Sequence, residues 1–176
     1  FKKGKEIIKN PHRHLLNDID NLPFYDKEAY EHDLFYKKWF MIVTSRGCPF
    51  SCTYCTESFN THFNKGIGKK LREQSPERVI KELEYWKKKY DFEEVDFKNN
   101  SFSASKKWTL EFLKLYKKQI GVPYRIMTHP LLIDEDIAKA FKESNCHRIQ
   151  LGIQSMNEHT RHKILHRFEP NMRIVE

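Results

Sequence analysis

Three of the four cysteines in the chain lie within eight residues of one another, in the segment SRGCPFSCTYCTES. Cys48, Cys52 and Cys55 have the spacing C-x3-C-x2-C. Thiolates are soft ligands that suit zinc ions and iron–sulfur clusters. The sequence therefore contains a candidate metal centre whose ligands come from a single loop.

The number of cysteines bears on which metal this loop binds. A structural zinc site usually has four protein ligands, often as two separated pairs. Cys52 and Cys55 form one pair, but no second pair follows, and nothing in the sequence positions His62 as a fourth ligand. Electron-transfer iron–sulfur clusters usually have four cysteines. Three cysteines would leave one iron open to a ligand from outside the protein, and we expect the distant Cys146 to be a buried apolar residue.

The elements that must position this loop alternate between strands and helices. Short apolar runs predict strands at 39–45, 93–99, 124–128 and 148–154. Helical spacing and capping residues predict helices at 75–90, 103–119, 134–144 and 157–167. Because helical crossovers require parallel strands, the fold class is α/β, as an open doubly wound sheet or as part of a βα barrel.

Functional residues collect at the carboxyl ends of the strands in both architectures. The cysteine loop follows the first predicted strand. Polar residues follow the other three strands: Asn99, Asn100 and Ser101; Thr128 and His129; Gln154 and Ser155. Any one of them is compatible with a turn or a helix cap. Together with the cysteines, they predict a binding site at this edge of the sheet.

The cysteine motif resembles the signature of radical S-adenosylmethionine (radical SAM) enzymes, including the aromatic Tyr54 before the last cysteine. Segments 95–105, 124–146 and 147–167 resemble the next three βα units of that family, with a Gly-x-Gln-Ser stretch and a downstream Arg in the last. The resemblance covers residues 38 to 168. It implies a partial (β/α) barrel of about four βα units, within a core at 37–176 that stops short of the family's six units.

The resemblance implies an enzyme in which Cys48, Cys52 and Cys55 each bind one iron of a 4Fe–4S cluster. SAM would chelate the fourth iron, and an electron from the cluster would cleave SAM to a 5′-deoxyadenosyl radical. That radical abstracts hydrogen from a substrate in this family. A protein such as flavodoxin or ferredoxin would supply the electron. The substrate, and any residue that acts directly in catalysis, stay unassigned.

The resemblance also implies where SAM would be held. Tyr54 would meet the adenine, and Gln154 and Ser155 would lie near the ribose or carboxylate. Asn99 and Asn100 occupy the turn that holds the methionyl amine in the family. Many relatives have acidic residues at these two positions, and an amide keeps the hydrogen-bonding geometry but loses the negative charge.

Residues 1–36 differ from the rest of the chain because their apolar residues recur with no sustained period. The segment FKKGKEIIKN predicts a small hairpin that turns at Lys3-Gly4, and a polar, extended connector follows it. Within the connector, NDIDNLPFYD resembles the segment that joins a cobalamin-binding domain to the barrel in cobalamin-dependent radical SAM proteins. This resemblance implies cobalamin-assisted methyl transfer, a preceding cobalamin-binding domain, and a chain that is a fragment.

The chain has 176 residues and a formal net charge of +8. Its Lys residues are scattered, and several end predicted helices, where cations favour the helix dipole. A solvated surface is therefore preferred over a nucleic-acid groove, although a tRNA-modifying radical SAM enzyme stays an alternative, as does a non-catalytic zinc-binding module. No run reaches the length of a membrane span, and no signal peptide is evident. We expect a soluble, cytoplasmic protein that acts on a small molecule.

Overall fold

The computed structural model describes residues 1–29 and 37–175. Four parallel strands form one sheet, in the order β3 (Trp39–Ile42), β6 (Glu94–Phe97), β7 (Tyr124–Thr128) and β8 (Cys146–Leu151). Each strand pairs with the next one along this order. A doubly wound sheet reverses its strand order at a switch point, and this sheet has no reversal among the described strands. The predicted partial barrel of four βα units is therefore confirmed.

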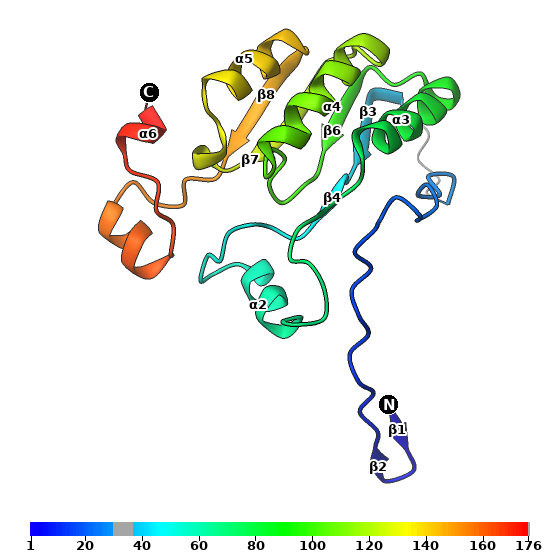
Figure 1. The fold of residues 1–176 in the computed structure, drawn as a ribbon, viewed down its shortest axis with the longest axis vertical. Coiled ribbons are helices and arrows are strands. Elements are labelled where there is room, and N and C mark those ends of the chain that lie inside the picture. Colours follow the sequence, from blue (N-terminus) through cyan, green and yellow to red (C-terminus); the bar gives the residue numbers. More distant parts are fainter. Residues whose placement is uncertain (30–36, 176) are drawn as a thin grey trace.

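Three helices cover one face of the sheet (Figure 1): α3 (Pro76–Tyr90), α4 (Lys106–Gln119) and α5 (Glu135–Glu143). Each begins where the sequence places a capping residue. The side chains of Ser75, Ser105 and Asp134 accept hydrogen bonds from backbone N–H groups in the first turn of their helices. None of the helices among the described residues is both long and apolar enough to cross a membrane.

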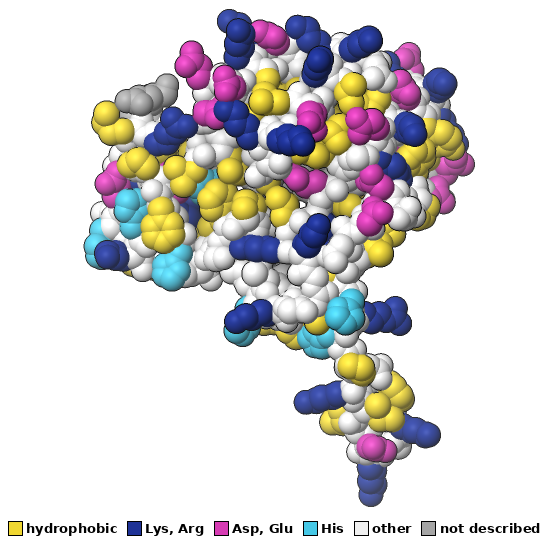
Figure 2. All heavy atoms as spheres, in the orientation of Figure 1, with side chains coloured by type: hydrophobic (Ala, Val, Ile, Leu, Met, Phe, Trp, Pro, Cys, Tyr) yellow, Lys and Arg dark blue, Asp and Glu magenta, His cyan; other side chains and the backbone are white. Residues whose placement is uncertain are grey.

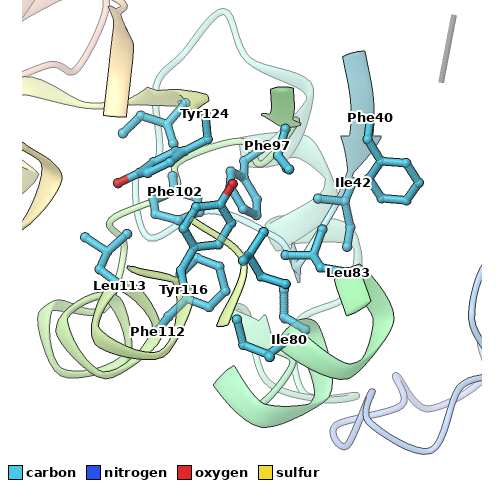
Figure 3. Packing of buried hydrophobic residues seen from close by; sticks show 14 of the residues in the cluster. Phe40, Ile42, Ile80, Leu83, Phe97, Phe102, Phe112, Leu113, Tyr116 and Tyr124 are labelled. Atoms are coloured by element: carbon cyan, nitrogen blue, oxygen red, sulfur yellow. The ribbon is translucent and has the colours of Figure 1, made fainter. Parts of the chain in front are cut away.

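The hydrophobic core lies between these helices and the sheet, and it is rich in aromatic rings (Figure 3). Phe97 of β6 packs edge-to-face against Phe112, Tyr116 and Tyr124, with ring centroids 5.5, 5.9 and 5.6 Å away. Such contacts add about 1 kcal/mol each to the free energy of burial. This aromatic packing therefore holds β6 and β7 against α4.

The first βα unit differs from its prediction. The strand expected at 39–45 ends at Ile42, and β4 (Ser45–Arg46) instead pairs antiparallel with β5 (Arg72–Glu73) in a separate small sheet. Between them lies a helix that the sequence did not predict, α2 (Thr56–Phe63). It has no buried residues, so it lacks the apolar stripe by which helices are recognised in sequence.

The fourth unit is also shorter than predicted. β8 ends at Leu151 rather than at residue 154, and the helix expected at 157–167 is mainly one π-helical segment, η2 (Thr160–Ile164). A short helix, α6 (Met172–Val175), follows it. The π-helix is a rare element that is often found at functional sites. Its contacts therefore bear on where the site lies.

The N-terminal hairpin is confirmed as an antiparallel pair, β1 (Lys2–Lys3) and β2 (Glu6–Ile7), which projects from the body on an extended connector (Figure 1). Further along, the connector packs on α3. Arg78 donates hydrogen bonds to the carbonyls of Asp20 and Leu22 at 3.2 and 2.7 Å, and its guanidinium stacks 4.0 Å from the ring of Phe24. The last part of the predicted connector, 30–36, lies outside the described residues.

Candidate functional site

A cavity of about 320 Å³ lies at the carboxyl ends of the strands. Seven of the eight residues that the sequence assigns to the site line it: Cys48, Cys52, Tyr54, Cys55, Asn99, Asn100 and Gln154. All the cysteines are free thiols. The structure thus brings together residues as distant in the chain as Cys48 and Gln154, at the edge of the sheet where the sequence places them.

Ser155 does not line this cavity. Its hydroxyl accepts a hydrogen bond from the backbone N–H of Asn157 at 3.2 Å, and its carbonyl accepts one from Arg161 at 2.6 Å. The residue therefore shapes the turn that leads into η2. Gln154, beside it, is exposed and has a left-handed backbone with φ of 69°, which aims its side chain toward the cavity while Ser155 turns away.

Gly47 and Lys70 hold the start of the cysteine loop. Gly47 has φ of 88°, and a Cβ atom there would lie 1.9 Å from the carbonyl oxygen of Lys70. The ammonium of Lys70 donates to the carbonyls of Pro49 and Phe50 at 3.0 and 2.9 Å. Only glycine allows this close approach, and the approach places the lysine where it can bind the loop carbonyls.

The π-helix η2 holds the other side of the loop. The backbone N–H of Thr53 donates to the carbonyl of Leu165 at 3.2 Å, and its hydroxyl donates to the carbonyl of Ile164 at 2.7 Å. The last carbonyls of a helix have no partner within the helix, so they are free to bind the loop. The segment between Cys52 and Cys55 is thereby tied to the fourth βα unit.

The thiols differ in their surroundings. Cys52 is buried, and burial raises the pKa of Cys48 above the ordinary value of a thiol. Within the described part of the chain, no three His, Cys, Asp or Glu side chains are placed to bind a single metal ion. A cluster of several irons requires a wider arrangement, because each thiolate binds its own iron. Three free thiols around one cavity fit that donor set.

Arg167 is the cation closest to the cysteines among the contacts of this site. It is buried, and its Nη1 atom lies 3.9 Å from Cys52 Sγ and 3.4 Å from the hydroxyl of Tyr54. Its other nitrogen atoms donate to the carbonyl of Gly152 and, at 2.8 Å, to Oε1 of Glu169. Arg167 therefore fixes a positive charge directly beside the thiol of Cys52.

Glu169, which the sequence did not single out, forms the wall behind this arginine. Its side chain is fully buried, and its Oε1 atom lies 4.0 Å from Arg161 Nε as well as against Arg167. Arg161 also donates to the backbone carbonyl of Glu169 at 3.1 and 2.8 Å. Arg167 and Glu169 stand two residues apart in the HRFEP stretch. This pairing of a basic with an acidic residue is the signal in the sequence by which the buried ion pair could have been found.

His129 completes the wall on the far side of Glu169. Its Nδ1 atom accepts a hydrogen bond from the backbone N–H of Leu131 at 3.2 Å, at the start of η1 (Pro130–Leu132). In the neutral ring the proton is therefore on Nε2, which lies 3.4 Å from Glu169 Oε2. Burial, followed by the nearby charge of Arg167, lowers the pKa of His129 to about 4, against the opposing effect of Glu169. The ring is neutral at neutral pH.

Asn99 and Asn100 have different surroundings. Asn99 is buried, and its side chain accepts from the N–H of Thr44 at 3.1 Å and donates to the hydroxyls of Thr44 and Ser45, both at 2.8 Å. Both amide protons are thus used to fix the segment before the cysteine loop. Asn100 is exposed. Of the two, Asn100 has the amide that is better placed to meet a ligand.

Comparison with known proteins gives one family. The model described as the radical SAM superfamily matches residues 42–176. The chain is 28% identical over 159 residues to the uncharacterized methyltransferase PH0819 of Pyrococcus horikoshii, covering 88% of this chain and 33% of that protein. It is 26% identical over 168 residues to the cytidylyl-2-hydroxyethylphosphonate methyltransferase of Streptomyces wedmorensis, covering 87% and 30%. The chain spans about a third of the length of these relatives.

Solved structures of the radical SAM methyltransferase TsrM from Kitasatospora setae share the fold. The structure with tryptophan and a SAM analogue superposes with a TM-score of 0.65 at 14% identity, covering 80% of this chain and 28% of that chain. A second structure of TsrM, with cobalamin and a [4Fe-4S] cluster bound, gives a TM-score of 0.62. At this identity the likeness concerns the fold alone.

Proposed function

The chain belongs to the radical SAM superfamily, and on that premise we propose that it carries the cluster-binding and SAM-binding part of a radical SAM methyltransferase. One observation carries the proposal. Three free thiols, Cys48, Cys52 and Cys55, line a single cavity where the strand ends of a partial barrel converge. Two relatives that are similar over most of the chain are named as methyltransferases, which supports the reaction class.

In this proposal Cys48, Cys52 and Cys55 hold a 4Fe–4S cluster as thiolates. When bound, the cluster supplies the electron that cleaves SAM. Arg167 lies beside Cys52, and Lys70 and Thr53 would keep the loop in place on both sides. These residues position the ligands before any cofactor arrives.

SAM would bind the other residues that line the cavity. The half-exposed ring of Tyr54 offers an aromatic face for the adenine. The amides of Asn100 and Gln154 offer donors and acceptors for the polar groups of SAM. The amide protons of Asn99 are bonded to Thr44 and Ser45, so Asn99 would meet the methionyl amine of SAM through its side-chain oxygen.

We extend the proposal to cobalamin as the second cofactor. TsrM, which shares the fold, has been solved with cobalamin bound, and the connector resembles the segment that follows a cobalamin-binding domain. Residues 20–24 of that connector pack on Arg78 of α3, so this part of the connector is held against the barrel. Absorbance spectra of the full-length protein purified with cobalamin would test this extension.

The central test is anaerobic reconstitution with iron and sulfide. We expect about four irons per chain, by the cluster type proposed, and an EPR signal of the reduced cluster that changes when SAM is added. Cys52→Ala should abolish the signal. Cys146→Ala is the matched control and should leave it unchanged, because Cys146 begins β8 outside the cavity.

Three results would overturn the proposal. Stoichiometric zinc in a colourless protein would favour the zinc-binding module instead. An EPR spectrum that does not respond to SAM would show that no iron is open to it. Loss of the cluster in Cys146→Ala alone would show that the ligand set is wrong.

A further inference from the structure

A second cavity, of about 500 Å³, lies beside the start of the cysteine loop. It is enclosed by α2, by the loop from Asn64 to Lys70 and by Leu15 of the connector. Gly47, which precedes the first cysteine, lines it, and Glu57 lines both cavities. The proposed function does not use this second cavity.

The second cavity is strongly basic. Arg46, Lys65, Lys70 and Arg72 line it, against the single carboxylate of Glu57. That carboxylate accepts a hydrogen bond from Asn60 at 3.1 Å. Among the residues that the structure describes, none of the four cations forms an ion pair with a carboxylate. In Figure 2, Lys, Arg and His side chains gather over α2 and the loop beside it.

Two of these cations oppose each other directly. Arg46 of β4 and Arg72 of β5 are cross-strand partners in the antiparallel pair. Like charges directly opposite each other destabilise such a pair, and two arginines here are unfavourable unless something negative lies between them. Burial and the charge of Arg46 lower the pKa of Arg72, against the opposing effect of Glu57.

Arg72 also has an unused donor. Its Nε atom is buried and has no hydrogen-bond partner among the described residues, while its Nη1 atom donates to the carbonyl of Leu16 at 3.3 Å. A buried guanidinium N–H without a partner costs free energy. An anionic oxygen in the cavity would satisfy this donor and separate the two arginine charges.

We propose that this second cavity binds a phosphoryl group of a small molecule, at a site distinct from that of the cluster and SAM. Two planar guanidinium groups on neighbouring strands match the oxygens of a tetrahedral phosphoryl group, each through paired N–H donors. Lys70 also lines the cavity, but its ammonium already donates to the carbonyls of Pro49 and Phe50 and to the hydroxyl of Ser51, so the two arginines carry the binding.

Titration calorimetry of the full-length protein with inorganic pyrophosphate tests the site. We expect saturable binding that weakens with salt, and a loss of at least about tenfold in affinity for Arg72→Gln, since charge-assisted bonds are removed. Arg46→Gln is the second variant, because Arg46 is exposed and its one side-chain hydrogen bond among the described residues is the 3.4 Å contact with the hydroxyl of Tyr25. Lys139→Gln, an exposed residue of α5, is the control and should bind as the wild type does.

The inference fails if wild type binds no pyrophosphate, or if both arginine variants bind it as tightly as wild type. It also fails if Lys139→Gln weakens binding equally, because that result marks non-specific attraction to a basic protein. Acetate and poly-glutamate are titrated in the same way as a final comparison. Equal binding of these carboxylates would replace the phosphoryl assignment with an acidic protein partner.

Discussion

At the scale of single residues, Gly47 is the position where the backbone decides whether the cysteine loop forms. We predict that Gly47→Ala lowers the free energy of unfolding by well over the 1–2 kcal/mol that a left-handed conformation costs an L-residue, because its Cβ would collide with the carbonyl of Lys70. Thermal unfolding and the iron content after reconstitution measure the effect.

Gly66 offers a matched control for this prediction. It has φ of 83°, close to that of Gly47, but a Cβ atom there would meet nothing within 4 Å. Gly66→Ala should therefore show only the conformational cost. Equal losses in the two variants would mean that the contact with Lys70 does not matter.

Glu169 is the buried charge on which two arginines depend. We predict that Glu169→Gln lowers the free energy of unfolding by about 3 kcal/mol, because it leaves the buried Arg167 without a carboxylate, whereas Arg161 keeps that of Glu158 at 3.7 Å. Urea unfolding measures this change. Glu143→Gln, which breaks an exposed ion pair with Lys117 at 3.8 Å, should cost about 0–1 kcal/mol, and a similar loss in both variants would contradict the buried network.

His129 makes stability depend on pH. The unfolded ring takes up its proton near pH 6.5, whereas the folded ring does so only near pH 4. Between these values the unfolded state binds more protons, so the free energy of unfolding falls as the pH falls from 6.5 toward 4. His129→Gln should flatten this part of the profile, measured by urea unfolding at several pH values. A variant with the wild-type slope would assign the dependence to other groups.

At the scale of elements, Arg78 fixes the connector to α3. Its fork binds the carbonyls of Asp20 and Leu22 and the carboxylate of Glu82 together. We predict that Arg78→Lys, which keeps the charge but loses the fork, speeds amide hydrogen exchange of residues 19–25 while α3 stays protected. Arg13→Lys, in the exposed part of the connector, should change nothing. Unchanged exchange in Arg78→Lys would show that the connector is held in another way.

The helices differ in how well the sequence predicts them. α3, α4 and α5 each combine a capping residue with an apolar face that packs on the sheet, and both signals are local. α2 buries no residue, and η2 departs from the ordinary helical period. Their positions depend on the loops and strand ends that they contact.

At the scale of the whole molecule, the sheet and its helices form one body, and the N-terminal hairpin stands apart from it (Figure 1). We predict that limited trypsin treatment cuts after Lys9, because this exposed residue precedes the contact of His12 with Phe63 of α2, whose ring centroids lie 4.1 Å apart. Mass spectrometry identifies the cut, and the melting temperature of the body should not change. If trypsin cut within residues 19–28 before it cut after Lys9, the connector would not be packed on α3.

The sequence by itself determined the donor set and the order of the elements. The spacing of Cys48, Cys52 and Cys55, the alternation of strands and capped helices, and the polar residues at the strand ends are all properties of neighbouring positions in the chain. From them followed the parallel α/β fold, which the structure confirms, and the edge of the sheet at which the site lies. Local propensity and hydrophobic period suffice for such predictions.

Only the tertiary structure decided what each polar residue at that edge does. It engages Asn99 with Thr44, turns Ser155 away from the cavity, ties Thr53 to η2, and buries Glu169 between two arginines. It also sets Arg46 opposite Arg72. These contacts join residues that are distant in the chain or are fixed by turns of rare geometry, so they depend on how whole elements pack, and no local pattern in the sequence encodes that packing.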